Sequence, residues 1–163
     1  MQTGAYLSQL LKAQLHAGAV GQMSWREEFH AVALLVDIAE SSPLTERFEA
    51  EGPHGAERLN TVLDRYFGEV FDIVVAYGGD VVQIEGDAVL VVWRDGRTSG
   101  DPAGLAADAA IALREAFDGR PLMFDVVLRH RIALAAGTIT AIGFENRGER
   151  GFLGRKFLQD VKS

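Results

Sequence analysis

Three carboxylates lie next to apolar stretches of this 163-residue sequence. Asp37 follows the run F-H-A-V-A-L-L-V, and Glu85 and Asp87 flank Gly86 between two β-branched runs. An ionised carboxylate at the end of a buried strand needs a hydrogen-bond donor, a cation or a metal ion to offset its lost hydration. If Asp37 and Asp87 lie side by side in the fold, they repel each other unless one is protonated or a cation lies between them.

The two aspartates indicate a site for a hard divalent cation and a triphosphate. Mg²⁺ uses one or two protein carboxylates and fills its other positions with water and substrate phosphates. A helix that begins after Asp37, capped by Ser41 or Ser42, adds backbone N–H donors for a phosphate. The alternative is that Asp37 caps a turn and Asp87 is a solvated hairpin residue. Glu85 is either a third metal carboxylate or an exposed hairpin tip.

Hydrophobic spacing predicts the elements that position these residues. A continuous apolar run predicts a strand covered on both faces. Apolar residues three and four apart predict a long helix that ends at Gly78-Gly79, and two β-branched runs joined at Glu85-Gly86 predict a hairpin. The expected elements are a strand at 29–38, helices from about 43 and over 56–77, the hairpin over 80–93, a helix at 105–117, strands at 126–136 and 138–144 on either side of a turn at Gly137, a short strand at 152–153 and a helix start at 155–162.

This order of elements predicts an α+β fold of the ferredoxin-like type, the split βαβ palm. Helices should cover one face of a mostly antiparallel sheet. The first strand then pairs beside the hairpin, which brings Asp37 and Asp87 together at one edge. Arg129 and Arg131, on the strand at 126–136, face either solvent or an anion or dimer partner. Residues 1–28 are expected to form a helix and a linker, and residues 29–163 one domain.

Composition excludes several classes of protein. The sequence is 48% hydrophobic and 24% charged, as in soluble globular domains. Its net charge of −7 argues against a nucleic-acid or anionic-membrane surface. Without cysteine, it has no disulfide or thiolate metal site. It has neither a secretory signal nor an apolar run long enough to span a membrane, so a cytoplasmic location is expected.

Two segments resemble the class III nucleotidyl cyclases, whose motifs read roughly D-I-x-G-F-T-x-L-[ST]-E and G-G-x-x-x-K-x-x-G-D-A. The corresponding segments here are V-D-I-A-E-S-S-P-L-T-E at 36–46 and Y-G-G-D-V-V-Q-I-E-G-D-A-V-L-V-V-W at 77–93. The stretch R-I-A-L-A-A-G-T-I-T at 131–140 is similar to a third family strand. The L-A-A-G form and the W-R after the hairpin are most similar to the first catalytic half of the bicarbonate-responsive soluble adenylyl cyclases.

The resemblance implies a role for each matching residue. Asp37 and Asp87 match the family's two metal-binding aspartates, and Ile38 matches the position whose carbonyl also binds metal. Two Mg²⁺ or Mn²⁺ ions per site would activate the ribose 3′-hydroxyl, which attacks the α-phosphate with loss of pyrophosphate. Glu40, Ser41 and Ser42 stand where the first family motif reads G-F-T, which is a departure, and Gln83 stands at the base-reading position. The family forms its active sites at a dimer interface.

Departures from the family pattern fall on the residues that read the base and stabilise the transition state. Gln83 replaces the base-reading Lys. In the later motif G-D-x-V-N-x-x-x-R, Arg155 stands in place of the Asp and Leu158 in place of the Asn. Lys162 stands in place of the Arg and lacks the planar, forked guanidinium group. The family also continues with further elements beyond the point where this sequence ends, so the catalytic domain is expected to be incomplete at its C-terminal end.

The expected function is therefore a cyclase domain that uses ATP, or GTP, to form a cyclic nucleotide, with cAMP favoured over cGMP. It would be the metal-bearing half, weakly active alone and paired with a second cyclase domain or with its own copy. Substrate contacts are expected from Gln83, Ser41, Ser42 and Lys162. The alternative is a catalytically degenerate cyclase homology domain that serves as a nucleotide-binding, regulatory or dimerisation module.

Overall fold

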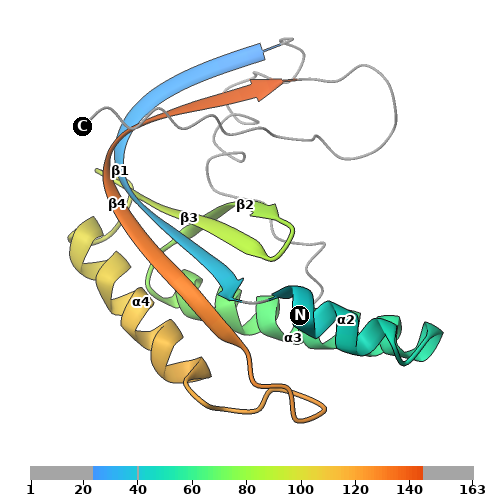
Figure 1. Cartoon of the computed structure of the whole chain (residues 1–163). Helices are drawn as coiled ribbons and strands as arrows, with labels where there is room; N and C mark the ends of the chain where they lie inside the picture. The colour runs from blue at the N-terminus through green and yellow to red at the C-terminus, as the bar shows by residue number, and fades with distance from the viewer. Residues whose placement is uncertain (1–23, 40, 145–163) are drawn as a thin grey trace.

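The computed structural model in Figure 1 describes residues 24–39 and 41–144. Its elements are β1 (Ser24–Ala39), α2 (Ser41–Glu49), α3 (Pro53–Ala76), β2 (Asp80–Glu85), β3 (Ala88–Arg94), α4 (Pro102–Phe117) and β4 (Arg129–Phe144). The strands form one sheet in the order β2-β3-β1-β4, with every neighbouring pair antiparallel. This order confirms the predicted α+β, ferredoxin-like palm. The helix predicted near the N-terminus and the elements predicted at 152–153 and 155–162 lie outside the described residues.

The main core lies between one face of the sheet and helices α3 and α4. Alternate residues of the two central strands point to this face and are buried against the helices. Burying each large apolar side chain contributes roughly 1.5–3 kcal/mol, so this layer dominates the stability of the fold. The prediction that helices cover one face of the sheet is therefore confirmed. The largest fully buried side chains here are Trp93, Tyr66, Phe48, Phe117, Leu34 and Leu113.

The junction between α3 and β2 fixes where the hairpin begins. Gly78 has a φ of 77°, and its N–H bonds to the Val75 carbonyl at 2.9 Å. A side chain on Gly79 would place its Cβ 2.7 Å from the Trp93 ring. The Trp93 indole N–H donates to the Tyr77 carbonyl at 2.8 Å. The predicted end of the helix at Gly78-Gly79 is thus correct, and the Trp93 hydrogen bond links this end of α3 to strand β3.

Two predicted turns differ from the structure. Gly137 does not end a strand, because β4 runs through it and pairs Gly137 with Ala31. Its φ is outside the left-handed region, so the residue adds curvature rather than a turn. In the hairpin, the two loop residues are Gly86 and Asp87, while Glu85 still belongs to β2 and pairs with Ala88. The predicted turn was displaced by one residue.

The second face of the sheet carries no helix within the described residues. Figure 1 shows β1 and β4 continuing together as a curved ribbon beyond the end of the β2–β3 hairpin. A small apolar cluster lies on this face, where the ribbon curves toward the hairpin, and it includes Phe29, Val82, Val92 and Ile139. We call this the outer face. Among the described helices, none is long and apolar enough to cross a membrane.

Candidate active site

The structure brings Asp37 and Asp87 together. Asp37 on β1 pairs with Ala88 on β3, and Asp87 directly precedes Ala88. Gly86, with a φ of 62°, supplies the positive dihedral that the first residue of a tight two-residue hairpin loop needs. Diagonal positions on adjacent strands lie about 6 Å apart, given the strand spacing and rise. Both aspartates are half-buried. Their predicted proximity at one edge of the sheet is confirmed by this register.

A third side chain, Tyr66 of α3, is buried in the main core within reach of the charges of both aspartates. It is 0% exposed, and its hydroxyl has no hydrogen-bond partner in the described structure. Burial raises the pKa of Tyr66, and the charges of Asp37 and Asp87 raise it further. In the sequence, Tyr66 is one of the apolar-spaced residues of the helix predicted over 56–77. The one sequence signal for a special role was its hydroxyl, because phenylalanine would fill the same core without a polar group.

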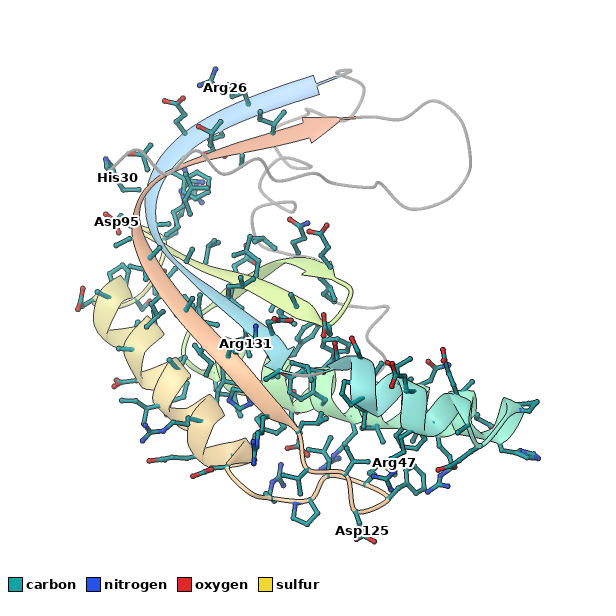
Figure 2. All side chains as sticks on the ribbon, in the orientation of Figure 1. Arg26, His30, Arg47, Asp95, Asp125 and Arg131 are labelled. Carbon is teal, nitrogen blue, oxygen red and sulfur yellow. The ribbon has the colours of Figure 1, made fainter. Side chains whose placement is uncertain are left out.

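No arginine, lysine or histidine forms an ion pair with either aspartate within residues 24–39 and 41–144; the ion pairs there lie elsewhere, as between Arg94 and Glu27. The nearest cation by register is Arg131, which pairs with Asp37 across β4 and is exposed. Figure 2 shows Arg131 beside the carboxyl end of β1. The exposure of Arg131 fits a side chain that faces solvent, and its pairing with Asp37 leaves an anion contact beside that residue open.

The donor set fits a divalent cation that shares its coordination with phosphates. In the described ranges no group of three or more His, Cys, Asp or Glu side chains converges. Two carboxylates are nevertheless enough for Mg²⁺ when water and phosphate fill its other positions. The Ile38 side chain is buried in the main core. Only its backbone carbonyl is therefore a candidate ligand, as the family resemblance implies.

A pocket of about 390 Å³ opens on the outer face, and its lining includes Ala88, which pairs with Asp37. Gln83 and Glu85 of β2 line it, and the Gln83 side-chain Nε2 donates to Glu85 Oε2 at 3.0 Å. Paired residues form one row across the whole sheet: Glu85 with Ala88, Ala88 with Asp37, and Asp37 with Arg131. Directly paired residues project to the same face of a sheet. Gln83, the predicted base-reading residue, lies two positions before Glu85 on β2. Its side chain therefore projects to the same face as Asp37.

The remaining predicted contacts divide into two groups. Ser41 and Ser42 begin α2, shortly after Asp37 along the chain. Ser41 is half-buried and Ser42 is exposed. They lie at the same edge as the aspartates, where the N-terminus of α2 offers backbone donors. Lys162, and the departures at Arg155 and Leu158, lie outside the described residues.

The fold is the ferredoxin-like palm that the catalytic domains of class III nucleotidyl cyclases share. Comparison with known proteins agrees, although no family profile matches the chain. Adenylate cyclase type 10 of Rattus norvegicus is 28% identical over 128 residues, which are 77% of this chain and 8% of that protein. Adenylate cyclase 2 of Rhizobium meliloti (strain 1021) is 33% identical over 112 residues, which are 68% of this chain and 29% of that protein.

A solved structure gives the same result. The adenylyl cyclase CyaB from P. aeruginosa superposes with a TM-score of 0.62 and 26% identity, over 75% of this chain and 63% of that one. The chain is thus a class III cyclase-type domain, similar to the soluble adenylyl cyclase known as type 10. It spans less than a third of either curated relative.

Proposed function

We propose that this domain is the metal-bearing half of a nucleotidyl cyclase active site, which forms a cyclic nucleotide and pyrophosphate from a nucleoside triphosphate. The observation that supports this most is the Asp37–Asp87 pair. Asp37 lies on β1 and Asp87 lies in the hairpin loop directly before β3, and neither has an ion-pair partner among the described residues. Such a pair carries a repulsion that a bound cation relieves.

In the proposed reaction the ribose 3′-oxygen bonds to the α-phosphorus, the bond to the pyrophosphate oxygen breaks, and the hydroxyl proton passes to solvent. Two Mg²⁺ or Mn²⁺ ions, held by Asp37, Asp87 and the Ile38 carbonyl, would lower the pKa of that hydroxyl and screen the phosphate charge. Arg131 would pair with a phosphate oxygen, since its fork suits phosphate geometry. Ser41 and the N-terminus of α2 would donate to the same group.

A second domain is needed in this proposal, and the outer face supports it. Leu35 is 44% exposed, and it lines the pocket with Ala133 and Ala135, which are exposed on the neighbouring strand β4. Contiguous exposed apolar surface of this kind commonly marks an interaction site. We propose that a complementary cyclase domain, or a second copy of this chain, covers it. Because Leu158 and Lys162 replace the family's Asn and Arg, a complementary domain is the partner expected to restore activity.

The same surface also supports a second candidate function. If the outer face only dimerises, the domain is a catalytically degenerate regulatory module that retains nucleotide binding. The presence of Gln83 at the base-reading position, in place of the family's Lys, favours this candidate. The two functions differ in whether product forms once a complementary domain is present.

The deciding experiment measures cyclic nucleotide formation from Mn²⁺-ATP and Mn²⁺-GTP. The purified chain is assayed alone and mixed with a cyclase domain that carries the family's Asn and Arg. We expect little product alone and clear product in the mixture, more from ATP than from GTP. The Asp87→Asn variant should abolish it. Strong activity of the chain alone would refute the need for a partner, and an inactive mixture would leave the regulatory module as the function.

A further inference from the structure

The hydroxyl of Tyr66 is a polar group that the packing of the main core does not require. Tyr66 is fully buried, and its hydroxyl has no hydrogen-bond partner among residues 24–39 and 41–144. The other fully buried residues of α3 are Val62, Val70 and Val74, which are apolar. A buried hydroxyl without a partner destabilises a protein, and phenylalanine would fill the same space without that penalty. Such a group in a native core therefore indicates a role outside packing.

The aromatic ring of Tyr66 is held firmly by its neighbours. It packs against the Phe67 ring, with centroids 5.4 Å apart, and against the Phe117 ring at 5.1 Å. Because a buried ring fixes the direction of its C–O bond, only the hydroxyl hydrogen remains free to rotate toward a partner. The oxygen therefore has a defined position from which it can donate one hydrogen bond.

The place of Tyr66 along α3 brings its side chain level with the loop of the β2–β3 hairpin. The chain reverses between Ala76, the last residue of α3, and Asp80, from which β2 runs back along the helix (Figure 1). Tyr66 precedes Ala76 by about 15 Å of helix. Glu85, the last residue of β2, follows Asp80 by about 17 Å of strand. The two lengths match, so Tyr66 lies near the end of the sheet where Asp87 follows β2.

A neutral hydroxyl near two carboxylates can serve them as a hydrogen-bond donor, because ionised carboxylates only accept. Burial raises the pKa of Tyr66, and the charges of Asp37 and Asp87 raise it further, which agrees with this placement and keeps the proton on the hydroxyl. Carboxylates that bind a metal are themselves commonly hydrogen-bonded by residues outside the coordination shell. These donors orient the ligands, and losing one weakens metal binding by about ten- to hundredfold.

We propose that Tyr66 is a positioning residue of the metal site, whose hydroxyl donates to a carboxylate oxygen of the Asp37–Asp87 pair when a divalent cation is bound. This inference rests on the proposed function, because it takes the two aspartates as the metal ligands. Tyr66 acts through these ligands, by holding one carboxylate in the orientation that the cation requires. The family resemblance of the sequence implied no role for this residue.

Calorimetric titration of the whole chain with Mn²⁺ alone, together with thermal unfolding in metal-free buffer, tests the proposal on the variant Tyr66→Phe. The Mn²⁺ dissociation constant should rise about tenfold, at the lower end of the effect of losing such a donor. The Tm of the metal-free protein should rise by roughly 2–4 °C, because the unpaired hydroxyl is gone. The control Tyr77→Phe removes the hydroxyl of a half-buried tyrosine at the end of α3 and should leave the Mn²⁺ affinity unchanged.

The two measurements together separate this role from a purely structural one. If Tyr66→Phe bound Mn²⁺ as tightly as the wild type, at any Tm, the inference would be overturned and the proposed function would stand. A variant that lost both Mn²⁺ affinity and Tm would indicate a disturbed core, and this result would also overturn the inference. If Mn²⁺ does not bind the wild type, the proposed metal site fails, and the inference fails with it.

Discussion

Replacing Asp87 by Asn should have opposite effects on stability without and with a divalent cation. Two unit charges about 6 Å apart repel by about 0.7 kcal/mol in water and about 3 kcal/mol at an effective dielectric constant of 20. Both aspartates are half-buried. We therefore expect about 1 kcal/mol, near the solvent limit. In metal-free buffer at low salt, Asp87→Asn should raise the free energy of unfolding by that amount.

Adding Mn²⁺ should reverse the difference in stability, so that the wild type becomes more stable than Asp87→Asn. A ligand at one hundred times its dissociation constant stabilises the folded state by about 2.7 kcal/mol. The wild type should gain this stabilisation, and the variant, with one carboxylate lost, should gain little. For a chain of this size, 1 kcal/mol shifts the Tm by roughly 2–4 °C. Asn is tolerated in tight turns, so the hairpin loop should keep its conformation.

Thermal and urea unfolding, with and without Mn²⁺, measure both effects. The control Asp108→Asn removes an exposed carboxylate from α4 and should change neither stability nor the response to Mn²⁺. In 1 M NaCl the metal-free gain should shrink, because the Debye length falls to about 3 Å. The explanation would be refuted if Asp87→Asn destabilised the metal-free protein, or if Mn²⁺ stabilised the wild type and the variant equally.

Three further predictions concern single residues. Arg131→Gln should weaken Mn²⁺-ATP binding about tenfold, through loss of a charge-assisted phosphate contact, whereas Arg114→Gln on α4 should not; calorimetry would contradict this if both behaved alike. Trp93→Phe should lower the free energy of unfolding by about 2–4 kcal/mol in urea titrations, because it leaves a cavity and removes the bond to the Tyr77 carbonyl; a loss below 1 kcal/mol would argue against this. Burial lowers the pKa of His130 below its ordinary value of 6.5, although the Asp118 charge opposes this. The unfolded chain then takes up the proton first, so stability falls as pH drops below about 6.5. His130→Gln should reduce the loss of Tm between pH 7.5 and 5, and an equal loss in both proteins would be inconsistent with it.

The sequence predicted the layers of this fold because burial leaves a periodic pattern. The apolar spacing of α3 reflects its one covered face. The continuous run of β1 predicted cover on both faces, whereas Leu35 on the outer face is 44% exposed among the described residues. It failed at Gly137, where a glycine permits either a turn or a curved strand. Pairing with Ala31 on β1 decides between them, and that contact joins residues more than one hundred positions apart. Local sequence carries no record of such a partner.

The site was predictable to the extent that topology determines it. The ferredoxin-like order places β1 beside the hairpin, so the meeting of Asp37 and Asp87 followed from the element order alone. The position of Tyr66 did not follow, because the depth at which α3 packs decides whether its hydroxyl reaches the carboxylates. The face of the sheet that Gln83 and Glu85 share likewise did not follow from the order of elements.

One extra residue in β2 decides which face of the sheet Gln83 and Glu85 occupy. Val81 pairs with Val91 and Gln83 with Leu90, so Val82 is a bulge. Without it, Gln83 would pair with Val89, which is fully buried beneath the helices, and its amide would enter the main core. With it, Gln83 shares a row with Leu90 on the outer face, and Glu85 shares the next row with Ala88 and Asp37. Bulges commonly redirect side chains next to active sites. Strict alternation would have separated the base-reading residue from the aspartates, and nothing in V-V-Q-I-E marks the bulge. This irregularity therefore places the proposed base site and the proposed metal site on one surface.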